Sequence, residues 1–143
     1  MYLHQEKYIR ELLNKARMVD CKPISTPFTT NTFLSLHDGQ LLDDPMYYKS
    51  IIEALQYCTL TQLEISFALN KTCQFLHAPT IMYLQAVKHI LCYLKGTMTY
   101  DLTFNANLCF NLTYFIDVDR ASCSDNQKTT GGVYIFFVSN LIS

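Results

Sequence analysis

The spacing of apolar and polar residues predicts helices in the first part of the chain. Between residues 5 and 18, apolar side chains recur every three or four positions and charged side chains fill the opposite arc, as in an amphipathic helix. A similar apolar stripe follows Asp44 and Pro45, a pair typical of a helix start because Asp caps the first turn and Pro fits its first position. We therefore expect two helices there.

Two more helices are predicted before the pattern changes. Thr61 and Glu64 have the spacing of a capping box, and residues 65–76 continue with an apolar face. The chain restarts after Pro79 and carries a further apolar face to Gly96, where we expect the helix to stop because glycine favours a helix C-terminus.

A connector and a sheet complete the predicted layout. Residues 19–44 are expected to be extended, because Pro23 and Pro27 disfavour both helix and central strand. Beyond Gly96 the sequence changes to short aromatic and β-branched runs, which predict strands. These runs cover residues 100–104, 109–117 and 133–138. The expected fold class is α+β, with a helical domain over 1–96 and a strand domain over 97–143.

Composition narrows the function classes only slightly. Eleven Lys and Arg against twelve Asp and Glu give a formal charge of -1, so any nucleic-acid surface must be local rather than a global basic field. The N-terminus shows no apolar signal core and no window approaches the ~18 apolar residues of a membrane span. We expect an intracellular protein, cytoplasmic or nuclear, with no membrane partner.

The cysteines are spaced singly, so no C-x-x-C pair begins a zinc or redox motif. We interpret them as reduced thiols, most of them in the core. They are Cys21, Cys58, Cys73, Cys92, Cys109 and Cys123.

Seven blocks follow one another along most of the chain: LHQEKYIRELL, CKPISTP, YKSIIEALQYCTLT, ISFALNKTCQFLHAPT, QAVKHILCYLKGT, YFIDVDRASCSDNQKTTGG and SNLIS. In content and order they resemble plant copia-type retrotransposon Pol polyproteins. The resemblance implies that residues 1–96 are similar to the thumb and connection helices of reverse transcriptase. It implies that residues 97–143 are similar to the opening strands of an RNase H-like α/β unit, and that the chain is a fragment of the polyprotein.

The resemblance also implies partners and chemistry. The parent family performs RNA-directed DNA synthesis and RNase H cleavage with Mg²⁺, on a primer-template or RNA:DNA hybrid, within the rest of the polyprotein. Its polymerase site uses a Tyr-x-Asp-Asp turn, whose carboxylates hold two metal ions about 4 Å apart. That turn is absent from the sequence, and the later RNase H acids of the family would lie beyond Ser143. We therefore expect this chain to be catalytically inactive.

One carboxylate remains a candidate. Asp117 matches the first acid of the family's Asp-Ala-Asp-Trp-Ala-Gly block, so the resemblance implies a remnant RNase H catalytic residue and Mg²⁺ ligand. The alternative is an Asp that ends a strand at the solvent. Asp119 would face the same side of the strand and either assist or remain solvated.

Departures from the family pattern favour a copy that has drifted. Arg120 stands where the family has Trp, Ser122 where it has Gly, and Gly131 where it has Ser or Thr. Residues 62–64, Gln-Leu-Glu, replace Arg-Pro-Asp. A charge in place of a buried Trp would create a packing defect.

Three lysines are candidates for nucleic-acid binding. Lys88 and Lys95 lie on one face of the fourth predicted helix, with Cys92 between them, and Lys71 lies near the end of the third. A thumb helix would set such lysines against phosphates. The alternative, which we favour for the isolated chain, is a solvated helix face. A third hypothesis is a host-recruited interaction module that uses apolar faces.

The remaining histidines and thiols are interpreted as structural. His77 and His89 lack partners at zinc-ligand spacing, apart from Cys92 three residues after His89. Cys58 and Cys73 fall on apolar helix faces and are expected in the core.

Overall fold

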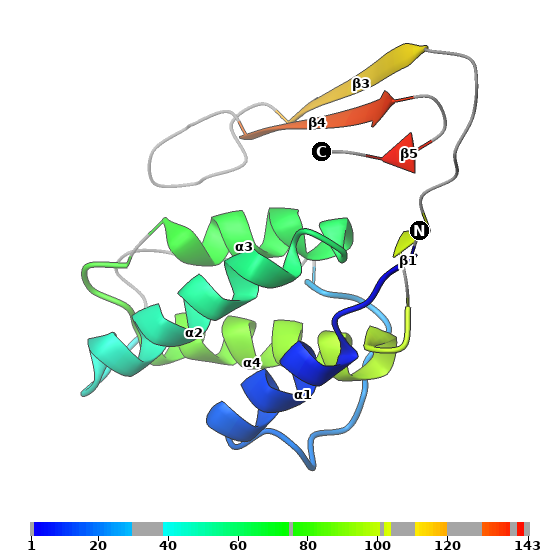
Figure 1. The fold of residues 1–143 in the computed structure, drawn as a ribbon. Coiled ribbons are helices and arrows are strands. Elements are labelled where there is room, and N and C mark those ends of the chain that lie inside the picture. The colour runs from blue at the N-terminus through cyan, green and yellow to red at the C-terminus, as the bar shows by residue number, and fades with distance from the viewer. Residues whose placement is uncertain are drawn as a thin grey trace. The chain divides into compact units, whose positions relative to one another are not determined.

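The computed structural model describes residues 2–29, 39–74, 76–100, 102–103, 111–119, 130–137 and 140–141. Contacts divide the chain into a helical unit, residues 4–100, and a strand unit, residues 1–3 and 101–143. Helices in one unit and strands in the other confirm the α+β class (Figure 1).

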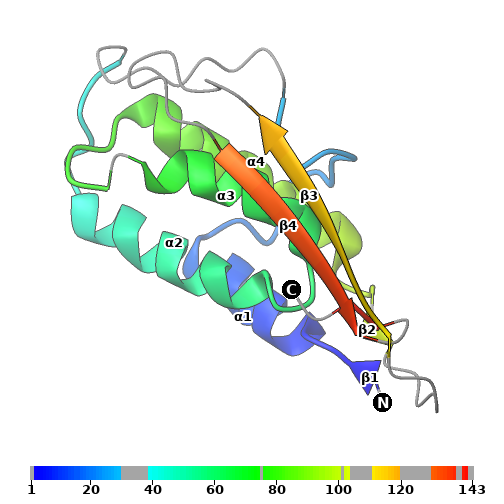
Figure 2. The same cartoon turned by 90° about the horizontal axis from the view of Figure 1, so that it is seen from above.

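The helical unit consists of α1 (Glu6–Lys15), α2 (Pro45–Cys58), the short 3-10 helix η1 (Leu63–Ile65), α3 (Ser66–Cys73) and α4 (Ile81–Thr97). Helices α1 and α3 each contact both α2 and α4. Figures 1 and 2 both show α2 beside α3. Their apolar faces meet in one core, so this unit has an interior of its own.

Helix α1 ends in a tight turn that contains a strained residue. The N–H of Arg17 donates to the carbonyl of Asn14 at 3.0 Å, and the N–H of Met18 donates to that of Leu13 at 2.8 Å. These two bonds form a Schellman motif. Arg17 has φ 55°, in the left-handed region where glycine is usual because a side chain is disfavoured there.

Helix α2 begins as predicted. The side chain of Asp44 accepts a hydrogen bond from the N–H of Tyr47 at 2.9 Å, and Pro45 occupies the first helical position. The predicted apolar stripe is buried, namely Tyr48, Ile51, Ile52 and Leu55.

The start of the third helix differs from the expectation. No capping box forms at Thr61, whose hydroxyl instead donates to Oε1 of Gln5 at 2.9 Å. Gln62 is buried and donates to the carbonyl of Thr97 at 3.1 Å. The polar side chains of this turn bind other parts of the fold, and α3 starts from η1 without a side-chain cap. The capping-box prediction was therefore wrong.

Helix α4 continues through Gly96 to Thr97, so the predicted stop at Gly96 was also wrong. Gly96 instead allows the connector to pack closely against α4. A Cβ atom at Gly96 would lie 3.3 Å from Cβ of Pro23 and 3.6 Å from the carbonyl oxygen of Ile24. The connector therefore lies against α4 at a position that has no side chain.

The connector, residues 19–44, has no helix or strand in its described parts, 19–29 and 39–44, apart from a single bridge from Leu41 to Thr80. Residues 30–38 lie outside the described residues. The first part lies along α4, where His89 Nε2 is 2.9 Å from the carbonyl oxygen of Thr26. The prediction that the connector forms no regular helix or central strand is confirmed for the described parts, and its extended conformation stays a prediction.

The strand unit contains β1 (Tyr2–Leu3), β2 (Leu102–Thr103), β3 (Leu112–Asp119), β4 (Thr130–Phe137) and β5 (Asn140–Leu141). Strand β3 pairs antiparallel with β4, which also pairs with β5, while β1 pairs with β2. The predicted strands are present within shifted limits, and β1 and β5 were not predicted.

Candidate nucleic-acid interface

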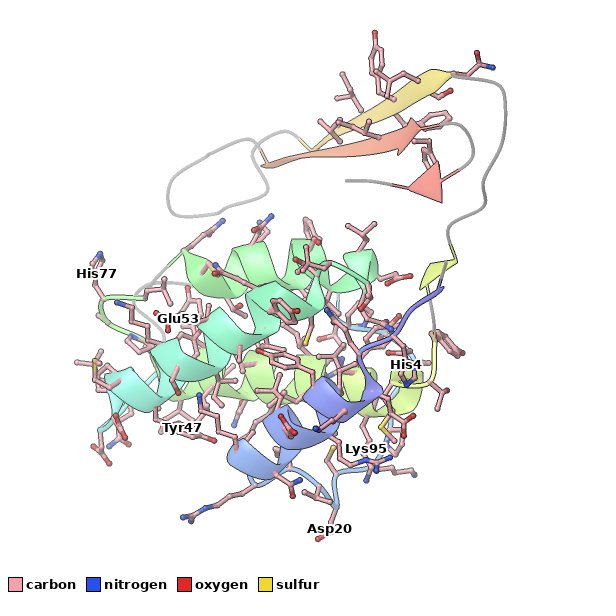
Figure 3. The ribbon with its side chains drawn as sticks, viewed as in Figure 1. His4, Asp20, Tyr47, Glu53, His77 and Lys95 are labelled. Carbon is pink, nitrogen blue, oxygen red and sulfur yellow. The ribbon has the colours of Figure 1, made fainter. Side chains whose placement is uncertain are left out.

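The three lysines predicted to bind nucleic acid have different surroundings. Lys95 is half-buried, and its Nζ donates to the carbonyl oxygens of Val19 at 2.5 Å and Cys21 at 2.8 Å. Hydrogen bonds from a charged donor are stronger than those from a neutral donor, so the two bonds of Lys95 hold the connector against α4. Figure 3 labels Lys95 near the end of that helix. Its role toward phosphates stays a prediction.

Lys71 lies in the last turn of α3, next to an aromatic ring. Its Nζ is 5.6 Å from the centre of the Phe67 ring, within the range of a cation–π interaction. The Phe67 ring in turn meets Phe28 of the connector edge to face, at 6.0 Å between ring centres. Lys71 thus has a packing role that its sequence position did not indicate.

Lys88 is exposed, and within the described residues its side chain has no hydrogen bond or ion pair. It borders a hollow of about 560 Å³ between α1, the first turn of α2 and α4. We call this the basic hollow. Its lining residues are Lys15, Ala16, Arg17, Met18, Tyr47, Leu84 and Lys88.

The basic hollow gathers three cations. Lys15, Arg17 and Lys88 are all exposed, and among the lining residues that the structure describes there is no carboxylate. The Nζ of Lys15 donates to the carbonyl of Ser50 at 3.4 Å, which holds this charge near α2. Positive charges without acidic partners attract phosphates at long range.

Tyr47, which Figure 3 labels, also lines the hollow. Its hydroxyl donates to the carbonyl of Ala16 at 3.2 Å, which joins the start of α2 to the end of α1. The strained turn at Arg17 follows that carbonyl directly. The same turn that ends α1 therefore sets the position of one of the three cations.

The residues missed from the sequence are Lys15 and Arg17. They lie far from Lys88 along the chain, and only the packing of α1 against α4 brings the three together. The available signal was the cluster of basic residues at the predicted end of the first helix, which also fits a simple helix-dipole role.

The candidate catalytic carboxylate lies in the strand unit. Asp117 is in β3, where its backbone is paired with Gly132, and Asp119 is paired with Thr130. The side chains of both aspartates, and the departures at Arg120 and Ser122, lie outside the described residues. Among the side chains that the structure describes, no three His, Cys, Asp or Glu residues gather to hold a metal ion. The roles of Asp117 in catalysis and Mg²⁺ binding stay predictions.

Two of the thiols lie on helices at positions that the sequence pattern predicted. Cys58 is fully buried, and burial raises its pKa to about 12. Cys73 is half-buried, and burial raises its pKa as well, while a hydrogen bond from Gln56 opposes the rise. Cys109 and Cys123 lie outside the described residues.

Comparison with known proteins gives the chain a family. An uncharacterized mitochondrial protein of Arabidopsis thaliana, AtMg00810, is 39% identical over all 143 residues, which cover 59% of that protein. The retrovirus-related Pol polyproteins from the Arabidopsis thaliana transposons RE1 and RE2 are 36% and 33% identical, again over the whole chain. The chain belongs to the copia-type retrotransposon Pol polyproteins. No protein-family model and no solved structure matches it.

The Pol family membership confirms the resemblance that the seven sequence blocks predicted. The chain spans only 10% of the length of each of the two polyproteins and 59% of the mitochondrial relative. It therefore corresponds to one segment of a Pol polyprotein. Within the described residues, no helix is both long and apolar enough to cross a membrane.

Proposed function

We propose that this chain is a catalytically inactive segment of a copia-type Pol polyprotein. In this proposal the helical unit corresponds to the thumb and connection of reverse transcriptase, and the strand unit to the opening of the RNase H domain. The observation that carries it is the match of all 143 residues to one tenth of the RE1 and RE2 polyproteins. The parent activity is RNA-directed DNA synthesis with Mg²⁺-dependent cleavage of RNA:DNA hybrids.

We infer that the chain is inactive because it has too few carboxylates for two-metal catalysis. Two-metal phosphoryl transfer needs several acids that converge on the ions. The sequence has no Tyr-x-Asp-Asp turn, and the family's RNase H block contributes Asp117 and its neighbour Asp119. One such block is insufficient to hold two ions in a closed site.

Two activity assays test this proposal. We expect no primer extension and no hydrolysis of an RNA:DNA hybrid by the purified chain with Mg²⁺. Activity that co-purifies as a contaminant would persist in the Asp117→Asn variant. Hydrolysis that is present in the wild type and lost in Asp117→Asn would contradict the proposal and make Asp117 catalytic.

The basic hollow favours a second candidate function, binding of a nucleic-acid strand without catalysis. Lys15, Arg17 and Lys88 offer three exposed cations around one depression. Lys71 and Lys95, the other two lysines predicted from the sequence, already have packing or backbone contacts. We therefore expect Lys88 to contribute more to phosphate binding than either of them.

A salt titration tests this second function. Binding of a labelled RNA:DNA hybrid should weaken with salt, and the double substitution Arg17→Gln and Lys88→Gln should lower the slope of log K against log salt by about 2. The charge-matched control is Lys7→Gln with Lys22→Gln, two lysines outside the hollow. Equal slopes for both double variants would exclude a specific role for the hollow.

A further inference from the structure

Strand β3 lies at the edge of its sheet. The order of the described strands is β3-β4-β5, so β4 pairs with one side of β3 and no described strand pairs with the other. All eight residues of β3 pair one to one with residues of β4, without a bulge. The free side of β3 therefore presents a regular row of backbone N–H and C=O groups, which is a template for a further strand.

Strand β3 lacks the features that usually protect such an edge. Proteins block exposed edges with proline, lysine, bulges or very short strands. The strand Leu112–Asp119 is eight residues long and contains neither proline nor lysine. Four of its apolar side chains are each at least 59% exposed, namely Leu112, Tyr114, Phe115 and Ile116. The edge can therefore accept a strand that has a similar apolar pattern.

The sequence of β3 complements itself when two copies run in opposite directions. Paired residues of an antiparallel ladder lie on the same face of the sheet, so odd positions pair with odd and even positions with even. A twofold axis at Phe115 pairs position 115 with itself, 114 with 116, 113 with 117 and 112 with 118. Aromatic residues then lie opposite aromatic or β-branched residues, which are the favourable cross-strand pairs.

Other antiparallel registers fit less well. An axis at Tyr114 pairs residues 112–116 alone, which leaves the end of the strand without a partner. An axis at Ile116 sets Phe115 opposite Asp117. The axis at Phe115 therefore combines a ladder over residues 112–118 with apolar residues opposite apolar residues.

The charges of β3 favour the same direction. Asp117 and Asp119 are its two charged residues, and both lie at one end of the strand. In the antiparallel register centred on Phe115, position 117 lies opposite Thr113 and position 119 opposite Asn111. In a parallel, in-register ladder each aspartate would lie opposite its own copy, and like charges opposite one another are destabilising. The edge thus matches a second copy of itself in both apolar and charged positions.

We propose that two copies of this chain associate through β3, in antiparallel register about a twofold axis at Phe115. The pairing joins two three-stranded sheets in the order β5-β4-β3-β3-β4-β5. A sheet of two or three strands is marginal by itself, and the joined sheet satisfies the backbone groups of both free edges. This interaction surface goes beyond the proposed function and does not depend on it. It occupies the edge of β3 and leaves the two faces of the strand for other contacts.

Sedimentation equilibrium of the full chain tests the association. We expect a dimer that dissociates on dilution. Phe115→Lys places two like charges on the twofold axis, so it should raise the dissociation constant of the dimer by at least about tenfold. Met46→Lys is the matched control, because Met46 is an exposed apolar residue of α2, and it should leave the dimer unchanged.

Four outcomes of this measurement would overturn the proposal. They are a wild type that is monomeric at every concentration, assemblies larger than a dimer, a dimer that survives Phe115→Lys, and a dimer that Met46→Lys weakens equally. Circular dichroism checks the folding of each variant.

Introduced thiols test the register and decide the question if the lysine variant fails to fold. In Phe115→Cys the two new thiols lie directly opposite one another, with Cβ atoms about 4.5–5.5 Å apart, which a small adjustment brings within reach of a disulfide. In Tyr114→Cys they are diagonal neighbours about 7–8 Å apart. Peptide mapping after mild oxidation should therefore find the link between copies sooner in Phe115→Cys. An equal or faster link in Tyr114→Cys, or no link between copies in either variant, would overturn the proposal.

Discussion

The helical unit and the strand unit differ in how far they expose their apolar side chains. The helical unit buries its large apolar residues in a continuous core, in which Tyr48, Leu55 and Ile90 are fully enclosed. In the strand unit, β3 exposes four of its apolar residues, each by more than half. They are Leu112, Tyr114, Phe115 and Ile116.

That difference shows which unit can support itself. Consecutive strand residues face opposite sides, so the exposure of Tyr114, Phe115 and Ile116 puts large exposed apolar side chains on both faces of β3. A sheet of two or three strands is marginal without a further layer. We therefore expect the helical unit to fold on its own core, and the strand unit to require another surface, which other parts of a Pol polyprotein would supply.

The largest expected effect comes from a cavity in the helical core. Leu55→Ala should lower the free energy of unfolding by about 2–5 kcal/mol, because Leu55 is fully buried in the core of the helical unit. Chemical denaturation followed by helical circular dichroism measures it. The matched change in the strand unit, Ile116→Ala, should alter that transition by less than about 0.5 kcal/mol. Similar effects of both would contradict the contrast between the units.

Alkaline pH should act mainly on the helical unit. Burial raises the pKa of Cys58 from 9.0 to about 12, and burial also raises the pKa of Tyr48 and Cys73. The unfolded chain therefore loses these protons first as the pH rises above 9. Stability is unaffected by Cys58 below pH 9 and falls between pH 9 and 12, by roughly 1 kcal/mol for each pH unit.

Denaturation at several pH values measures this dependence. Cys58→Ala removes one of the titrating groups, so its stability should decline less steeply between pH 9 and 12 than that of the wild type. An equally steep decline would show that the Cys58 thiol ionises as easily in the folded protein as in the unfolded chain.

The link between connector and α4 should contribute less than the core. Lys95→Met keeps the aliphatic stem but removes the donor to the carbonyls of Val19 and Cys21, and we expect a loss of about 1–3 kcal/mol. Hydrogen exchange should show faster opening of residues 19–29 than of α2. Unchanged exchange in the connector would mean that its other contacts, at Gly96, His89 and Phe67, are sufficient to hold it.

The smallest effect should be a gain. Arg17→Gly removes a side chain from a left-handed backbone position and should stabilise the helical unit by about 0.5–1 kcal/mol. The same change should weaken hybrid binding, because it deletes a cation of the basic hollow. Thermal melting and the salt titration measure the two effects, and a loss of stability would show that the Arg17 side chain makes a compensating contact.

The sequence predicted the elements that local rules determine. Asp44 and Pro45 mark the start of α2 because capping and proline geometry act within one turn. Thr61 and Gly96 were misinterpreted because their roles depend on Gln5 and Pro23, which lie far away along the chain. The contacts of Lys95 could not be predicted for a similar reason, since the carbonyls that it binds belong to the connector, and its role toward phosphates stays a prediction.

The candidate interface was predictable only in part. Lys88 was proposed from its helix face, and its role stays a prediction, whereas Lys15 and Arg17 join it only through packing of α1 on α4. Asp117 was identified through the family block, and its strand follows from its β-branched and aromatic neighbours. Sequence spacing shows which residues share a helix or strand, whereas a binding site forms where several helices or strands meet.

The close contact at Gly96 predicts which substitutions should occur together in related copies of this sequence. A methyl group there would lie 3.3 Å from Cβ of Pro23, so a mutation to alanine would require the connector to move by a few tenths of an ångström. Among divergent copies, positions 96 and 23 should therefore change together, and lineages that lose the glycine should also lose the proline.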